Sequence, residues 1–517
     1  MNRTSLYKFE YVRASMLLFE TKKELADFYS NHYGYWSDDS KFKGRRVTLS
    51  VLRLEEWLNE SSELYTARLK SDNSLIGYAI ATRGTTSDKE ERIIWVTQFV
   101  VHSNYRNAGI GKELLFFIWG LSSYFSWGLV TANPYAIRAL EKATRRRCNP
   151  IRIKKNTVKL LNFGDKYVSY IKRESIEKEI DDKTSVVNTN FPIDHSEVPD
   201  MLKNITSEDK PWLLGELKEG WEWFAFTFND QDQIELTQEE IETMLTASDE
   251  IAKEAYSRML MDHKSHKWAS HTNIEVDYII EKCNLDKKDS ILDVGCGMGR
   301  HTLKLIEKGY CAIGVDYVPE LINSARKKVD KAKSEIFQVV DFSSTNIPFA
   351  SESFDTVLCL YDVIGSYIED CQNRNILANM FNVLRKGGYA LISVLNLHLT
   401  EAIAKNKFIL SESSMPLLNL ESSDTMEMNG NIFDPKYFLL DEQSKIVYRK
   451  EVFSYDNSFP KELIVRDKRF YGEEIVKLCT DIGFSIINLS YVKAGWDSTY
   501  NPQDKEAKEI LLLLQKK

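Results

Sequence analysis

The stretch SILDVGCGMGRHT, residues 290–302, decides the fold of the second half of the chain. Its apolar run SILDV is followed by Gly295, Gly297 and Gly299, and then by residues that open a helix. Glycines at a strand-to-helix junction allow a sharp turn and let a ligand approach the backbone closely. The pattern therefore predicts a nucleotide-binding loop, although a Gly-x-Gly motif alone would also suit a dinucleotide such as NAD.

Acidic residues stand near the ends of the strands that surround this loop. Asp293 lies two residues before the first glycine, and Asp316 ends the next apolar run, in IGVDY. A carboxylate at the second position suits the two hydroxyls of a ribose. Asp341 and Phe342 end the third run, where an acid beside an aromatic ring suits an adenine amine and its ring face. Strands and helices alternate over residues 290–396, which predicts a doubly wound, Rossmann-like parallel α/β sheet.

These motifs resemble the class I methyltransferases that use S-adenosylmethionine (SAM), over about residues 265–400. IPFASESFDTVLCLYDVIGSY, around the fourth strand, and LRKGGYALISV, around the fifth, extend the resemblance. It implies SAM as the cofactor in preference to NAD. Cys296 is expected to be a small structural residue of the loop and not a nucleophile. The residues implied for SAM binding are Asp293, Gly295, Cys296, Gly297, Gly299, Asp316, Asp341, Phe342 and Tyr361.

The segment after the fourth strand holds the candidate catalytic residues of this domain. The methyl group of SAM is already activated, so the protein chiefly has to position an acceptor in line with it. A base helps if the acceptor is protonated, and Asp362 and Tyr367 are the candidates. Asp362 could instead cap the following helix. Residues 405–465, rich in Phe, Tyr, Met and Ser, predict an inserted strand-rich cap that could enclose a small molecule.

Another glycine loop lies nearer the N-terminus, in VVHSNYRNAGIG, residues 100–111. It follows the apolar strand RIIWVTQFVV and precedes a helix that starts with KELLFF. Backbone N–H groups at such a junction are unpaired and point the same way, which suits a pyrophosphate. Gly109 and Gly111 are expected to let phosphate approach, and Arg106 adds positive charge. A tight turn that happens to carry Arg and Gly is the alternative.

The R-x-x-G-x-G pattern resembles the acetyl-CoA loop of the GNAT acetyltransferase superfamily. NPYA at 133–136 and ALEK at 139–142 extend the resemblance to roughly residues 60–150 and imply an α+β fold. Many members have a tyrosine that protonates the CoA thiolate where this chain has Leu140, while Tyr135, the candidate catalytic residue, lies earlier on the helix. The residues implied for acetyl-CoA binding are Val101, Arg106, Asn107, Ala108, Gly109, Ile110, Gly111 and Asn133.

Composition and charge set further limits. The 517 residues are 43% hydrophobic and 28% charged, which is typical of globular domains. The net charge of −8 disfavours a protein that mainly grips nucleic acid, although residues 145–155 form a basic cluster. Seven cysteines without Cys-x-x-Cys spacing and an N-terminus without an apolar core predict a cytoplasmic location and no metal site. The charge-free stretch 114–137 is broken by Gly, Ser and Pro, so no membrane partner is expected.

We therefore expect an N-terminal GNAT-like domain at residues 1–235, a linker helix at 236–264 and a class I methyltransferase domain at 265–517. The favoured function is a cytoplasmic, bifunctional transferase that methylates and N-acetylates a small-molecule acceptor. Two alternatives stay open. The first domain could be a regulatory module that binds acetyl-CoA without catalysis, or the protein could modify RNA or protein. The sequence leaves the oligomeric state open.

Overall fold

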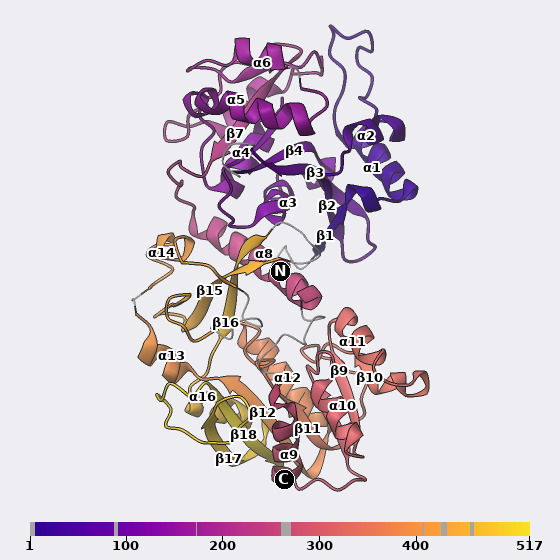
Figure 1. Cartoon of the computed structure of the whole chain (residues 1–517), viewed down its shortest axis with the longest axis vertical. Coiled ribbons are helices and arrows are strands. Elements are labelled where there is room, and N and C mark those ends of the chain that lie inside the picture. The colour runs from indigo at the N-terminus through magenta and orange to yellow at the C-terminus, as the bar shows by residue number, and fades with distance from the viewer. Residues whose placement is uncertain are drawn as a thin grey trace. The chain divides into compact units, whose positions relative to one another are not determined.

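The computed structural model describes residues 6–86, 91–171, 173–259, 270–405, 408–424, 432–454 and 460–517 (Figure 1). The chain forms two compact units, residues 1–251 and 252–517. The expected linker, 236–264, coincides largely with helix α8 (Gln238–Met259), and its residues 260–264 lie outside the described ranges. At the start of α8, Thr237 and Glu240 exchange the two hydrogen bonds of a capping box, 3.1 and 3.2 Å long.

The first unit contains a seven-stranded sheet in the order β1-β2-β3-β4-β5-β7-β6. All neighbouring strands are antiparallel except β4 and β5, which are parallel. The aromatic run WEWFAFTF forms β7. The strands are β1 (Tyr7–Arg13), β2 (Ser62–Leu69), β3 (Leu75–Thr85), β4 (Arg92–Val101), β5 (Ser126–Thr131), β6 (Val186–Asn188) and β7 (Trp221–Phe228).

Capping residues mark the ends of several helices in the first unit. Asn133 and Asn149 cap α4 and α5, each followed by a proline that suits the first helical turn. Gly120, with φ +62°, ends α3. The helices are α1 (Phe19–His32), α2 (Val51–Trp57), α3 (Ile110–Trp119), α4 (Pro134–Thr144), α5 (Pro150–Tyr167), α6 (Arg173–Glu179) and α7 (Val198–Ile205), with short 3-10 turns η2 (Ala14–Met16) and η3 (Ser103–Tyr105).

The charge-free stretch 114–137 is divided among α3, β5 and the start of α4. Its residues on α3 are buried in the first unit, which accounts for their apolar character. None of the helices in the described ranges has the length and apolar character of a membrane span.

The second unit contains a seven-stranded sheet in the order β10-β9-β8-β11-β12-β18-β17. The first five strands are parallel, whereas β18 and β17 are antiparallel to their neighbours. The strand order reverses between β8 and β11, the place where doubly wound sheets bind ligands. The strands are β8 (Ser290–Val294), β9 (Cys311–Asp316), β10 (Phe337–Val339), β11 (Phe354–Cys359), β12 (Leu384–Leu395), β17 (Phe484–Val492) and β18 (Glu509–Lys516).

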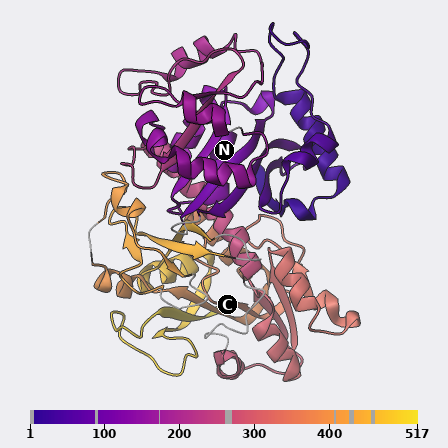
Figure 2. The same ribbon diagram turned by 45° about the horizontal axis from the view of Figure 1, so that its top comes forward.

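The expected strand-rich cap is confirmed as a sheet of its own within the second unit, orange in Figures 1 and 2. It consists of β13 (Ser423–Asp424), β14 (Phe438–Leu440), β15 (Ile446–Phe453) and β16 (Lys461–Lys468). The helices of this unit are α9 (Thr272–Lys282), α10 (Arg300–Glu307), α11 (Pro319–Arg326), α12 (Asp370–Val383), α13 (Leu397–Ile403), α14 (Met415–Leu418) and α16 (Gly472–Ile482), with the 3-10 turn η6 (Lys331–Ile336).

Candidate functional site

The glycine loop of the second unit joins β8 to α10, and its three glycines have different surroundings. All have positive φ, +71° at Gly295, +55° at Gly297 and +77° at Gly299. A Cβ added at Gly295 would lie 2.3 Å from Val363, and one at Gly299 would lie 2.5 Å from Phe337. A Cβ at Gly297 would meet nothing within 4 Å. Gly295 and Gly299 therefore serve chain packing, and Gly297 is the glycine that leaves room for a ligand.

Two carboxylates hold this loop in place. Asp316 accepts hydrogen bonds from the backbone N–H groups of Gly297, at 2.9 Å, and Val318, at 3.0 Å. Burial raises the pKa of Asp316, and these two bonds partly offset the effect. A carboxylate has about four acceptor positions, so Asp316 keeps capacity for ribose hydroxyls and fits SAM. Asp293 is buried and accepts the Thr302 hydroxyl at 2.6 Å, which ties β8 to α10.

Three other residues expected at the SAM site have distinct placements. The exposed Asp341 accepts bonds from the Ser343 backbone N–H and hydroxyl, at 2.9 and 2.6 Å. Phe342 is 4% exposed and packs with Phe349 in the hydrophobic core, so its ring does not present an open face for adenine. The Cys296 sulfur lies in a small apolar cluster, and burial raises the pKa of its thiol. This placement agrees with a structural Cys296.

The backbone after β11 has an unusual conformation at Tyr361 and Asp362. Their φ angles are +58° and +65°, so two consecutive non-glycine residues occupy the left-handed region. Each such residue costs on the order of 1 kcal/mol, and strain of this kind is concentrated at functional sites. The Tyr361 N–H donates to Ser393 Oγ at 2.8 Å, and the Arg300 guanidinium lies 4.3 Å from the centre of the Tyr361 ring.

Glu275 is the centre of a buried polar cluster that the sequence reasoning missed. Its carboxylate contacts Arg300 at 2.6 Å and His301 at 2.9 Å, and it accepts the Tyr361 hydroxyl and the Gly495 N–H. Burial alone would raise the pKa of Glu275, but the His301 bond and the Arg300 charge lower it to about 2. The only sequence signal was Arg300-His301 directly after the loop. The cluster fixes the first turn of α10 and the strained Tyr361.

Asp362 faces a second buried cluster, on strands β15 and β16. Asp467 accepts Arg449 Nε at 3.0 Å and Arg469 Nε at 3.1 Å, and Arg469 Nη1 also donates to Thr400 at 2.9 Å. The Oδ1 atom of Asp362 is buried and has no hydrogen-bond partner within the described part of the chain. Burial and the nearby Asp467 raise the pKa of Asp362 well above its usual value, against the effect of the two arginines.

The alternative role for Asp362, as a helix cap, is wrong. The following helix, α12, begins at Asp370 with Glu369 as its N-cap, seven residues beyond Asp362. The expected catalytic Tyr367 lies on the same segment, is partly buried against the core, and has Lys253 Nζ 5.1 Å from its ring centre. Asp362 Oδ1 therefore has no structural bond among the described residues that would explain its burial, and Tyr367 packs against the core.

The glycine loop of the first unit joins β4 to α3 through η3. Asn107 and Gly109 have φ angles of +60° and +89°, and the Ile110 side chain is buried. Within the described ranges, the backbone N–H groups of Asn107, Ala108 and Gly109 donate no hydrogen bond. Free N–H groups next to a helix N-terminus are the donors that a pyrophosphate requires, so this loop fits acetyl-CoA.

Gly111 and Arg106, both expected at the phosphate site, also make contacts within the first unit. A Cβ at Gly111 would lie 2.9 Å from Phe99 Cζ on β4, so this glycine permits close packing of α3 on the sheet. Arg106 donates to the Val101 carbonyl at 3.4 Å and to the His32 carbonyl, which ties the loop to β4 and α1. Gly111 therefore has a packing role, and the phosphate contact expected there stays a prediction.

The sheet of the first unit opens beside this loop. Strands β4 and β5 pair over only four positions, from Ile93 with Ser126 to Val96 with Leu129. Strand β4 continues to Val101, so residues 97–101 have no neighbour on the β5 side. A free strand edge can hydrogen-bond an extended ligand through its backbone. This edge fits the amide-containing arm of CoA.

The second element of the GNAT resemblance is the start of α4. The Asn133 side chain accepts the N–H groups of Tyr135 at 2.9 Å and Ala136 at 3.4 Å, so it is engaged as the helix cap. Leu140 is fully buried. Tyr135 precedes it by five residues, about 140° around the helix, and so lies on a different face. Tyr135 therefore does not replace the tyrosine that the family carries at the Leu140 position.

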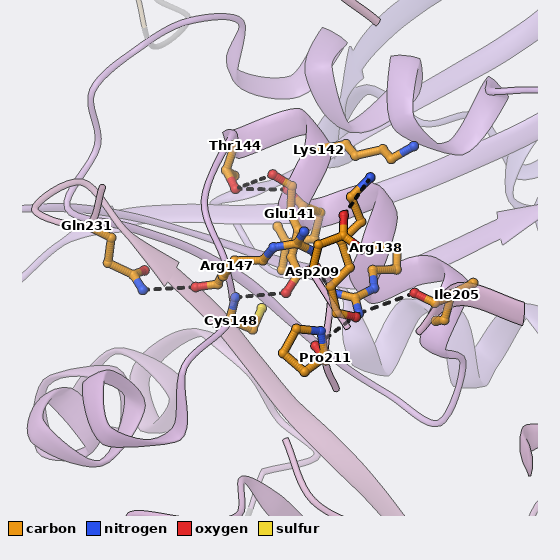
Figure 3. A network of polar contacts seen from close by, with 12 residues as sticks. Arg138, Glu141, Lys142, Thr144, Arg147, Cys148, Ile205, Asp209, Pro211 and Gln231 are labelled. Carbon is orange, nitrogen blue, oxygen red and sulfur yellow. Dashed lines mark hydrogen bonds and ion pairs between the residues drawn. The ribbon is translucent and has the colours of Figure 1, made fainter. Parts of the chain in front are cut away.

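The basic cluster at residues 145–155 is largely engaged within the first unit. Figure 3 shows Arg138 and Arg147 meeting at Glu141, with N–O distances of 2.5 and 3.0 Å. Glu141 also accepts the Cys148 N–H at 3.0 Å. Arg145 and Arg146 are buried, and Arg152 pairs with Asp230. Most of the arginines of this cluster are therefore engaged in contacts within the first unit.

Family comparisons match both units. The model described as Acetyltransferase (GNAT) family matches residues 25–143, and that described as Methyltransferase domain matches residues 291–388. The glycine/sarcosine N-methyltransferase of Aphanothece halophytica is 25% identical over 130 residues, 25% of this chain and 49% of the relative. A 23S rRNA (uracil(1939)-C(5))-methyltransferase of Haemophilus influenzae is 31% identical over 87 residues, 16% of this chain and 20% of the relative.

Among solved structures, a SAM-dependent methyltransferase from Clostridium acetobutylicum is 17% identical with a TM-score of 0.33, covering 51% of this chain and 97% of that one. The chain spans about half or less of the length of the curated relatives it matches. The two family matches decide between SAM and NAD in favour of SAM, and they pair acetyl-CoA with the first unit. The chain thus contains a GNAT acetyltransferase-family domain in its first unit and a SAM-dependent methyltransferase domain in its second.

Proposed function

We propose that the protein is a bifunctional transferase that methylates a small-molecule amine in its second unit and N-acetylates an acceptor in its first. The observation that carries the methyltransferase half is the unpaired, buried Oδ1 of Asp362. Asp362 precedes Val363, which packs directly against the glycine loop at Gly295. The carboxylate therefore lies on the segment that borders the loop expected to bind SAM.

The charges around Asp362 favour a cationic acceptor. Arg449 and Arg469 contribute two positive charges, which Asp467 and Glu451 match, so an Asp362 that ionises on binding the acceptor adds one uncompensated negative charge. Buried charge is costly unless it is compensated. A protonated amine beside Asp362 would balance the group, and the relative named as a glycine/sarcosine N-methyltransferase is consistent with such an acceptor.

Each of the named residues then has a separate role in the methylation. SAM, when bound, supplies an activated methyl group. Gly297 leaves room for it, and Asp316 offers acceptor positions to its ribose. Asp362 takes a proton from the acceptor ammonium, which frees the nitrogen lone pair for in-line attack. The Arg449–Asp467–Arg469 cluster holds the acceptor side of the site in position.

The test is the Asp362→Asn variant, with Asp330→Asn as control because Asp330 is exposed and its side chain caps no helix. Release of S-adenosylhomocysteine would be measured with a panel of small primary and secondary amines. We expect Asp362→Asn to lower the turnover about 100-fold or more, the usual contribution of a general base, with SAM binding by calorimetry unchanged. Unchanged turnover would exclude Asp362 as the base, and absence of SAM binding in the wild type would exclude the methyltransferase function.

The acetyltransferase half is supported by the free N–H groups at residues 107–109 and the open β4 edge. The buried Leu140 favours a second candidate, a domain that binds acetyl-CoA without transferring the acetyl group. A thiol-release assay with acetyl-CoA and small amines separates the two. Acetyl-CoA binding without amine-dependent thiol release would establish the regulatory role.

A modifier of RNA is the other candidate, favoured by the partial similarity to an rRNA methyltransferase. The pairing of the basic cluster within the first unit weighs against it. Binding of bulk RNA that falls steeply as salt rises would support this candidate.

A further inference from the structure

We propose that Glu222 in the first unit binds the primary ammonium group of the acetyl acceptor and is the base that deprotonates it. This inference rests on the proposed acetyltransferase function of that unit. What it adds is a specific residue for the amine and its proton, one that neither the sequence motifs nor the family match indicates.

The position of Glu222 on β7 places it next to the opening of the sheet. The last pair between β5 and β7 joins Thr131 to Trp223, so Glu222 lies one residue beyond the end of β5. Phe224 and Phe226, on the same face of β7, contact the Trp95 ring of β4 at centroid distances of 5.4 and 4.8 Å. Side chains from β7 and β4 therefore meet on this face, beside the unpaired β4 edge.

Glu222 is a buried carboxylate without a cation. It is 6% exposed, and no ion pair of the described residues includes it. Burial raises the pKa of Glu222 to about 7, and the neighbouring Thr189 hydroxyl only partly opposes this. Carboxylates are seldom buried without a partner charge. A ligand ammonium group would supply that charge.

The groups around Glu222 are aromatic and uncharged. Tyr29 of α1 and Tyr33, which directly follows that helix, stack at a centroid distance of 4.2 Å. Burial raises the pKa values of Tyr33 and Tyr170, and the negative charge of Glu222 adds to both shifts, which places the two phenols near the carboxylate. Ring faces attract ammonium groups. Tyrosine rings around one carboxylate therefore match the chemistry of an amine.

An unused hydrogen-bond donor lies on the same face. Gln98 of β4 is 7% exposed, and its Oε1 accepts the Tyr78 hydroxyl at 2.9 Å. Its buried Nε2 has no partner among the described residues. Tyr78 in turn lies within electrostatic range of Tyr33. A donor left unsatisfied in a buried polar cluster is expected where a ligand completes the bonding.

The chemistry balances with Glu222 as base. The acceptor nitrogen forms a bond to the acetyl carbon, and the carbon–sulfur bond of the thioester breaks. Of the two protons that the ammonium group loses, one goes to Glu222 and the other to the CoA sulfur. A base with a pKa near neutrality is suited to this task, because about half of it is ionised near pH 7 and the ionised form accepts a proton readily. No tyrosine at the Leu140 position is needed for the first proton.

The test measures amine binding in the full chain without acetyl-CoA. Butylamine is the probe and 1-butanol its uncharged control, with binding followed by ligand-observed NMR. The variant is Glu222→Gln, which keeps the shape of the side chain, and the matched control is Glu216→Gln, because Glu216 is exposed in the same unit. We expect at least tenfold weaker butylamine binding in Glu222→Gln alone. Equal binding by wild type and Glu222→Gln, or no binding by wild type, would overturn the proposal.

A second measurement, the pH dependence of thermal unfolding, tests the burial of Glu222 without relying on amine binding by the variant. The pKa of Glu222 is raised in the folded state, so its stabilising contribution is full below about pH 4.5 and is lost as pH rises through about 7. The groups that face it, Tyr29, Tyr33, Tyr170 and Thr189, carry no charge in that range. The thermal midpoint of the first unit should therefore fall more between pH 5 and 8 in wild type than in Glu222→Gln. Identical pH profiles would overturn the burial of an ionisable Glu222.

The two measurements also separate this proposal from the function on which it rests. If butylamine binding depends on Glu222 but no thiol is released from acetyl-CoA, the amine site stands and the acetyltransferase function fails. If acetyl-CoA and amines react equally well in wild type and Glu222→Gln, the function stands and the Glu222 site fails.

Discussion

The two glycine loops look alike in sequence, yet their glycines have different tasks. In the second unit, Gly297 faces open space, whereas Gly295 and Gly299 accommodate Val363 and Phe337. In the first unit, the second glycine of the motif, Gly111, accommodates the Phe99 ring. A glycine in a binding motif therefore marks a close approach, but the approaching group is as often a side chain of the same domain as a ligand.

The largest loss of stability is expected from substitution of Gly299. Gly299→Ala places a residue with a side chain at φ +77° and a Cβ 2.5 Å from Phe337. The left-handed backbone costs about 1–2 kcal/mol and overpacking about 1–3 kcal/mol, so the free energy of unfolding of the second unit should fall by about 2–5 kcal/mol. Gly309→Ala is the control, because Gly309 has φ +85° and nothing within 4 Å. Equal losses in a urea titration would contradict the packing role of Gly299.

A smaller effect is expected at Gly111, where φ is not positive and only the Phe99 contact matters. Gly111→Ala should lower the free energy of unfolding of the first unit by about 1–3 kcal/mol, while folded protein keeps its affinity for acetyl-CoA. Gly34→Ala, with nothing within 4 Å, is the control. Adding Phe99→Leu should recover part of the loss in a double-mutant cycle. Acetyl-CoA affinity lost without any change in stability would restore a phosphate contact at Gly111.

The smallest loss of stability is expected from substitution of Gly297, where the affinity for SAM should instead show the larger change. Gly297→Ala and Gly309→Ala share a positive φ and empty surroundings, so both should cost about 1–2 kcal/mol of stability. Calorimetry should show that Gly297→Ala weakens SAM binding about tenfold, or about 1.4 kcal/mol, whereas Gly309→Ala does not. Matching SAM affinities in the two variants would mean that Gly297 does not face the ligand.

Sequence reasoning located elements whose pattern is local. Apolar runs such as RIIWVTQFVV and SILDV predicted β4 and β8, and the linker helix expected at 236–264 includes most of α8. Residues 151–230 were hard to interpret apart from the run WEWFAFTF. The 18-residue helix α5 was missed there, and the other elements are short: β6 has three residues, and α6 and α7 have seven and eight. Elements so short show too few turns or alternations for a period to be read.

The sequence predicted where the two glycine loops lie, but not which side chains surround them. The surroundings of each glycine depend on side chains distant in sequence, such as Val363 beside Gly295. The residues of the polar clusters are still further apart in the sequence. Glu275 and Gly495, for example, are 220 residues apart. Glu222 shows no motif at all, because its environment is assembled from α1, β4, β7 and the segments between them. Contacts of this kind arise from tertiary packing, which spacing along the chain does not record.

The four-residue pairing between β4 and β5 has a consequence for how the first unit can open. Strands β1 to β4 come from one continuous piece of chain, residues 7–101, and β5 to β7 from a later one, residues 126–228. The seam between these two blocks of the sheet has few backbone hydrogen bonds, so separation there is expected before either block unfolds. A ligand that bonds to the free β4 edge and also contacts the later block would bridge the seam, and its binding would then raise the cooperativity with which the whole sheet melts.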